Sequence, residues 1–260
     1  MTDTNAPHAI ITDTNGLQAA SITLHVDGVD VPAYFARPEH GRQWPVVLVI
    51  CEIFGLHEYL ADICRRLAKE GYLAIAPELF VRQGDPKIYG NDFHAVLTQV
   101  VSKASDAQVL KDLDAAAEWA IGHGGDPHKL AATGFCWGGR MAWLYAAHNP
   151  SLKAAVAWYG RVSGGTDSLR PFHPLDAVHE LHAPVLGLYG AKDSGIPLET
   201  LEKMQLALKG GSPAAKRSSF KIYPEAGHAF HADYRPSYVE SAAKDGWQEM
   251  LAWLRAQRVA

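Results

Sequence analysis

Two hydrophobic patterns alternate along most of the chain. Short runs of consecutive apolar, often β-branched residues are typical of strands that are covered on both faces of a sheet. These runs span residues 45–51, 72–76, 154–159 and 184–189, and residues 219–223 form a last strand-like stretch that is less apolar. Around them, apolar residues recur at helical spacing and predict amphipathic helices. The helical stretches span residues 57–70, 105–117, 198–208 and 238–255, and the second begins with a capping-box pattern, Ser105 and Gln108.

The beginning of the chain has a different pattern. Residues 22–26 and 31–36 form two short strand-like stretches joined through Asp27-Gly28, which predicts an antiparallel hairpin. A hairpin followed by alternating strands and helices predicts an α/β protein with a mainly parallel, doubly wound sheet. The polar residues 1–20 are expected to form a flexible lead-in, and residues 21–260 a single domain.

Composition narrows the classes of protein. With 260 residues, 48% of them hydrophobic, the chain can bury a large core without disulfides or metals. A net charge of −4 without a dense Lys/Arg run argues against nucleic acid and anionic membranes as partners. The apolar runs are too short to span a bilayer, the N-terminus lacks a signal-peptide pattern, and three cysteines do not suggest a disulfide framework. We therefore expect a cytoplasmic monomer or weak homodimer.

A strand-like run ends at a glycine-rich turn that contains a cysteine. Gly134, Cys136 and Gly138 give Gly-x-Cys-x-Gly, the thiol form of the nucleophile elbow of α/β-hydrolases. The turn is sharp, so its flanking residues must be small, and the helix that follows points its N-terminus at the sulfur and favours thiolate. The alternative is a buried cysteine at a tight strand–helix turn.

Polar residues that follow other predicted strands could complete a catalytic site, because chemistry in such sheets collects at the carboxyl ends of strands. Asp193 and His228 each follow a strand, and Cys136, Asp193, His228 is the α/β-hydrolase order of nucleophile, acid and histidine. Asp193 could instead cap the helix after Pro197, and Asp176 is a rival acid. The pair His228 and His231 could suggest zinc, but suitable neighbouring ligands are missing; we expect neither metal nor cofactor.

Two further positions follow from the same logic. An oxyanion needs two backbone donors, and the N–H groups of Trp137 and Ile53 are suitably placed. Glu52 ends a buried strand, where a carboxylate requires a partner. It could form a structural salt bridge, or it could lie beside the thiol and accept its proton.

Five short motifs occur one after another along the chain. They are Cys51-Glu-Ile-Phe-Gly55, Glu78-Leu-Phe-Val-Arg-Gln83, Gly134-Phe-Cys-Trp-Gly-Gly139, Trp158-Tyr-Gly160 and Ala226-Gly-His-Ala-Phe230. From about Tyr34 to the C-terminus, this set resembles the dienelactone hydrolase (carboxymethylenebutenolidase) family.

The resemblance implies an α/β-hydrolase fold and assigns roles to particular residues. It implies a triad of Cys136, Asp193 and His228, and an oxyanion hole at Ile53 and Trp137. It also implies that Glu52 activates the cysteine when substrate binds and that Arg82 holds a substrate carboxylate. Phe54 and Tyr159, which lie in two of the motifs, are expected to contact substrate.

The chain departs from the family pattern at one position. The family's second substrate-binding arginine, four residues after the histidine, is Ala232 here. That arginine also holds the resting glutamate, so Glu52 is expected to have another partner. We therefore predict a hydrolase that acts through a thiol ester on a small ester or lactone, for which an anionic compound is one candidate. The alternatives are a general carboxylesterase or thioesterase, or a non-catalytic small-molecule binder.

Overall fold

The structure, a computed structural model, describes residues 9–90 and 92–260. Its centre is an eight-stranded sheet in the order β1-β2-β4-β3-β5-β6-β7-β8. The β1–β2 and β2–β4 pairs are antiparallel, and the remaining pairs are parallel. The strands are β1 Leu17–Val26, β2 Val29–Pro38, β3 Trp44–Ile50, β4 Leu73–Pro77, β5 Gly125–Phe135, β6 Leu152–Trp158, β7 Val185–Gly190 and β8 Ser219–Tyr223. This is the α/β-hydrolase fold that the sequence predicted.

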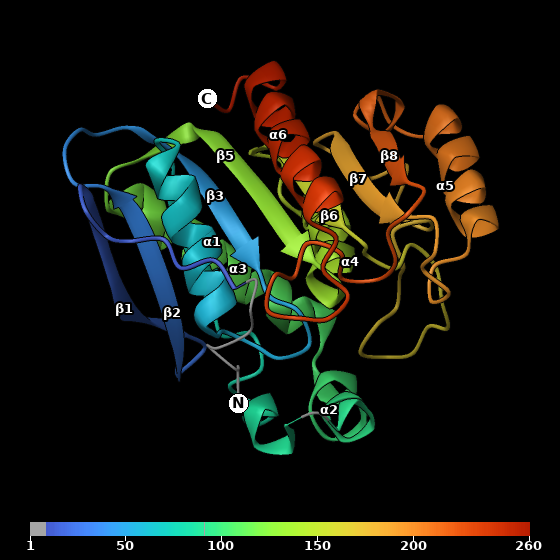
Figure 1. Ribbon diagram of the computed structural model, residues 1–260, viewed down its shortest axis with the longest axis horizontal. Helices are drawn as coiled ribbons and strands as arrows, with labels where there is room; N and C mark the ends of the chain where they lie inside the picture. The colour runs from blue at the N-terminus through green and yellow to red at the C-terminus, as the bar shows by residue number, and fades with distance from the viewer. Residues whose placement is uncertain (1–8, 91) are drawn as a thin grey trace.

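Helices cover both faces of the sheet (Figure 1). Helices α1 and α6 lie in front of the sheet in that view, and α3 and α4 lie behind it. The α-helices are α1 Glu58–Lys69, α2 Phe93–Gln99, α3 Asp106–Gly122, α4 Trp137–His148, α5 Leu198–Gly210 and α6 Glu240–Ala256. Short 3₁₀ turns lie at η1 Pro86–Tyr89, η2 Val101–Lys103 and η3 Ala215–Arg217. None of the helices within the described ranges is both long enough and apolar enough to cross a membrane.

The N-terminal hairpin is longer than expected. Its first strand begins at Leu17, and the pairing extends over ten residues to Val26 and Val29. The turn residues Asp27 and Gly28 both have positive φ, 50° and 76°, as a two-residue hairpin turn with the right twist requires. Residues 1–8 of the expected lead-in lie outside the described residues, and residues 17–20 belong to the sheet because β2 supplies their hydrogen-bond partners.

The structure differs from the sequence analysis in one local prediction and in one helix that was not predicted. The side chain of Ser105 caps no N–H group of α3, and Gln108 instead donates to Asp112 at 3.3 Å. The capping-box expectation was therefore wrong, because a carboxylate one turn further along the same helix binds the glutamine. Helix α2 was missed: it has seven residues and buries only Val96, so its hydrophobic pattern is weak. It lies away from the sheet, below the strand ends in Figure 1.

Candidate active site

The turn between β5 and α4 has the geometry of a nucleophile elbow. Cys136 has φ 55° and ψ −113°, a region that costs a non-glycine residue free energy and that is common at functional sites. A Cβ on Gly134 would lie 2.0 Å from the carbonyl oxygen of Gly138, and a Cβ on Gly138 would lie 2.4 Å from that of Cys51. Only glycine fits at either position, so the spacing in the sequence reflects two close backbone contacts.

Three side chains from distant parts of the chain form one hydrogen-bonded line. Nε2 of His228 lies 3.1 Å from Sγ of Cys136, and Nδ1 of His228 lies 2.7 Å from Oδ2 of Asp193. The other oxygen of Asp193 accepts the N–H of Gly195 at 2.9 Å. A carboxylate can only accept, so Nδ1 donates to it and Nε2 faces the sulfur. This is the connectivity of a nucleophile, a base and an orienting acid.

The surroundings of His228 favour its protonated form. Burial lowers the pKa of this histidine, but the hydrogen bonds to Asp193 and Cys136 outweigh burial and raise the pKa to about 10. The ring can therefore hold a proton taken from the thiol at neutral pH. The rival roles are not seen: α5 begins after Pro197 without a side-chain cap, and Asp176 accepts the backbone N–H of His173 at 2.8 Å.

A cavity of about 610 Å³ opens onto the sulfur. Ile53 and Trp137 both line it, and within the described part of the chain neither backbone N–H has an acceptor. Two free donors beside a nucleophile are what an oxyanion hole requires. Tyr159 also lines the cavity, with its ring centroid 5.2 Å from that of His228. Phe93, Leu97 and Val101, from α2 and η2, add apolar contacts.

Comparison with known proteins fits this geometry. The model of the family described as "Dienelactone hydrolase family" matches residues 31–258. The chain belongs to this family. It is accordingly related to hydrolases of the carboxymethylenebutenolidase type, as its motifs predicted.

Relatives and a solved structure agree over nearly the whole chain. A Yersinia pestis protein named "Putative carboxymethylenebutenolidase" is 55% identical over 248 residues, which cover 95% of this chain and 91% of the relative. A Bradyrhizobium protein named "Probable 2-oxo-3-(5-oxofuran-2-ylidene)propanoate lactonase" is 32% identical over 246 residues, covering 91% and 96%. The crystal structure of a "Putative Dienelactone Hydrolase" from Klebsiella pneumoniae has a TM-score of 0.89 at 56% identity, covering 92% and 98%.

Glu52 has a hydrogen-bond partner that the sequence did not reveal. Its side chain is fully buried, and Oε2 accepts the hydroxyl of Tyr234 at 2.5 Å. Oε1 has no hydrogen-bond partner among the described residues, and of the two alternatives for Glu52 the structural salt bridge is not observed there. Burial raises the pKa of Glu52, against the lowering effects of the Tyr234 hydrogen bond and of the nearby charges of Arg235 and His228. In this member of the dienelactone hydrolase family, a phenol thus holds the glutamate.

Two expected substrate contacts are not part of the cavity wall. Arg82 donates to Asp112 at 2.7 Å and to the carbonyl oxygen of Val26 at 3.1 Å, and it does not line the cavity. In this structure Arg82 is thus an arginine paired with a neighbouring carboxylate. The ring of Phe54 packs against that of Phe93, with 5.7 Å between centroids, and Phe93 rather than Phe54 lines the cavity.

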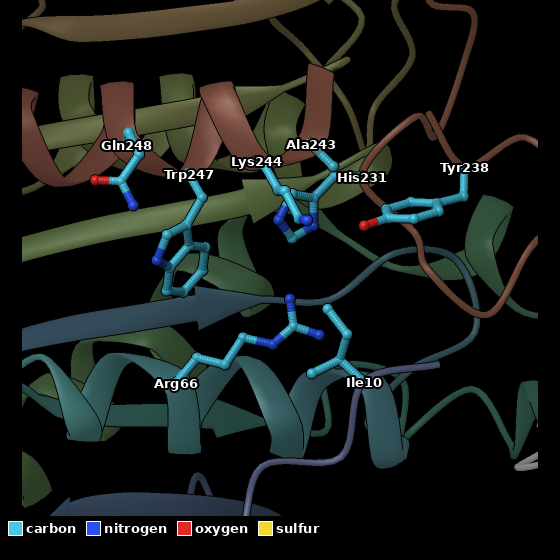
Figure 2. A pocket seen from close by; sticks show the side chains of 8 residues that line it. All are labelled: Ile10, Arg66, His231, Tyr238, Ala243, Lys244, Trp247 and Gln248. Carbon is cyan, nitrogen blue, oxygen red and sulfur yellow. The ribbon is translucent and has the colours of Figure 1, made fainter. Parts of the chain in front are cut away.

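Of the His228–His231 pair, His228 lines the cavity around Cys136, whereas His231 lines a second cavity of about 290 Å³. Figure 2 shows His231 with Arg66, Tyr238 and Trp247 around this space between α1 and α6. Nδ1 of His231 lies 2.7 Å from the hydroxyl of Tyr59, and burial lowers its pKa well below the ordinary value. The two rings face different cavities, so they are not arranged as a pair of ligands for one zinc ion.

Proposed function

We propose that the chain is a cysteine-dependent hydrolase that opens a small ester or lactone through a thiol ester on Cys136. The observation that carries the proposal is the unbroken line from Asp193 through His228 to the sulfur. Nucleophilic acyl transfer requires a thiol, a base beside it and an acid that orients the base.

In the first half of the reaction, His228 holds the proton taken from the thiol, and the thiolate sulfur attacks the carbonyl carbon. The N–H groups of Ile53 and Trp137 stabilise the negative oxygen that forms. As the carbon–oxygen ester bond breaks, His228 returns the proton to the departing oxygen. With a lactone as substrate, that oxygen stays attached to the acyl group as a new hydroxyl.

In the second half, water cleaves the thiol ester. His228 accepts a proton from water, the hydroxide adds to the carbonyl carbon, and the carbon–sulfur bond breaks with the proton returning to sulfur. The acid is released and Cys136 is regenerated. Glu52 acts beside this cycle as a carboxylate that can take the thiol proton once it leaves Tyr234.

The substrate is proposed to be small and anionic. A cavity of about 610 Å³ is in the range of sites for small molecules. The Bradyrhizobium relative carries the name of a lactonase whose substrate is a propanoate, which is an anionic lactone. The three cysteines are free, and a working thiol requires a reducing compartment, which supports the cytoplasm as the site of action.

The test compares Cys136→Ala with Cys64→Ala, a change at a fully buried cysteine of α1 outside the cavity. With p-nitrophenyl acetate as substrate, we expect Cys136→Ala to lose roughly 10³-fold or more in kcat/KM, as removal of a triad nucleophile does. Cys64→Ala should retain activity in its folded fraction. Mass spectrometry of the wild type with a slow substrate should find the acyl group on Cys136. Undiminished turnover in a folded Cys136→Ala protein would exclude the mechanism.

A further inference from the structure

Three arginines line the cavity around Cys136, and two of them are already neutralised. The terminal nitrogens of Arg140 donate to the two oxygens of Asp106, each at 2.7 Å, in a buried bidentate pair. Arg170 pairs with Asp167, with its Nε donating at 3.1 Å. Binding a substrate anion at either arginine would require an existing ion pair to break.

Arg161 is different. Its side chain is exposed and lines the same cavity, and it has no hydrogen-bond acceptor or carboxylate partner in the described ranges. Asp193 is the one carboxylate among the described lining residues, and His228 already occupies it. The cavity thus contains one cation whose charge no neighbouring side chain balances.

The backbone that carries Arg161 is held against the nucleophile elbow. The N–H of Cys136 donates to the carbonyl oxygen of Trp158 at 3.0 Å, three residues before the arginine. The N–H of Tyr159 donates to Leu188 at 2.8 Å, and the carbonyl oxygen of Val162 accepts from Leu175 at 2.9 Å. The backbone at Arg161 is therefore held in place, while its guanidinium group has no partner among the described residues.

We propose that Arg161 determines substrate specificity by binding a carboxylate of the substrate. The inference rests on the proposed function, because the carboxylate belongs to the ester or lactone that Cys136 attacks. A guanidinium binds a carboxylate through two parallel hydrogen bonds. No ion pair has to break when Arg161 does so, in contrast to Arg140 and Arg170. In this chain, Arg161 thus takes the role that was expected of Arg82.

The experiment compares a γ-butyrolactone carboxylate with the corresponding primary amide, which has a similar shape and no charge. Each compound is measured as a substrate and as a competitive inhibitor of p-nitrophenyl acetate hydrolysis. The wild type should prefer the acid by about ten- to a hundred-fold in both measurements, as expected for one charged bidentate contact. The preference should decrease as ionic strength rises.

Variants then assign the preference to one side chain. Arg161→Gln should remove most of the ratio between acid and amide, mainly through weaker binding of the acid. Arg161→Lys should restore part of it, because an ammonium keeps the charge but not the planar fork. Arg217→Gln, at an exposed arginine of η3 outside the cavity, is the matched control and should keep the wild-type ratio.

The outcomes separate this inference from the proposed function. Cys136-dependent hydrolysis of p-nitrophenyl acetate with equal constants for acid and amide would overturn the role of Arg161 and leave the proposed function intact. An unchanged ratio in Arg161→Gln would do the same. A wild type that hydrolyses none of these compounds would overturn both.

Discussion

Two buried carboxylates serve the site around Cys136, and they differ in how completely their oxygens are hydrogen-bonded. Asp193 has a partner on each oxygen, His228 on one and the N–H of Gly195 on the other. Glu52 has Tyr234 on one oxygen and no partner among the described residues on the other. Asp193 is therefore held in one position, whereas Glu52 can move without breaking more than one hydrogen bond.

The difference identifies a local loss of stability at Glu52. A buried carboxylate with an unpaired oxygen carries a desolvation cost that a satisfied one does not. Burial raises the pKa of Glu52, which records this cost. Natural sequences tolerate such violations mostly at functional sites. Three substitutions probe the two carboxylates, in order of decreasing expected effect.

Asp193→Asn should cause the largest change, a loss of about 10³- to 10⁴-fold in kcat/KM for p-nitrophenyl acetate. The amide of asparagine can donate to Nδ1 of His228, which favours the tautomer that no longer accepts the thiol proton. Asp176→Asn is the control, since Asp176 is exposed and accepts a backbone N–H. A loss of less than tenfold would show that the aspartate does not orient the histidine.

Glu52→Gln should lower kcat/KM by roughly 10²-fold, the lower range for loss of an acid–base group, while making the protein more stable. The amide keeps an oxygen for Tyr234 and removes the buried charge, so the free energy of unfolding should rise by about 1 kcal/mol at pH 8. Urea unfolding and steady-state kinetics measure the two effects. A variant that is both less stable and fully active would contradict the comparison.

The stabilisation by Glu52→Gln should depend on pH in a defined direction. The pKa of Glu52 is raised above its ordinary value of 4.5 in the folded protein. Below that ordinary value the carboxyl is protonated both folded and unfolded, so the variant gains nothing. As the pH rises from there through the folded pKa, the unfolded state ionises more readily and the advantage of the variant grows to its full size. A gain that is as large at pH 4 as at pH 8 would have another origin.

Tyr234→Phe should have the smallest effect on rate and a clear one on stability. It removes the one hydrogen bond of Glu52, which should cost about 1–3 kcal/mol at neutral pH, because both carboxylate oxygens are then unpaired. We expect kcat/KM to change by less than tenfold. In a plot of kcat/KM against pH, the acidic limb should shift to higher pH. Tyr89→Phe, on η1, is the control. In the Glu52→Gln background, the cost of Tyr234→Phe should shrink, and equal costs in both backgrounds would disprove the coupling.

The sequence by itself determined most of the elements and predicted an order for the catalytic residues. Buried strands and the nucleophile elbow have signals within a few residues, because hydrophobic periodicity and the need for glycine at Gly134 and Gly138 are local properties. The order of Cys136, Asp193 and His228 followed from one rule, that chemistry collects at the carboxyl ends of parallel strands. Helix α2 lacked such a signal, since it buries a single residue.

Only the tertiary structure decided which polar side chains meet. Tyr234 lies 182 residues after Glu52, and no pattern near either residue marks the pair. Arg82 and Arg161 both follow predicted strands, yet Asp112 occupies the first and no described carboxylate pairs with the second. The physical reason is that a charged side chain several bonds long pairs with whatever group packing brings within about 3 Å. That choice depends on neighbours from distant segments, so it appears only when the chain has folded.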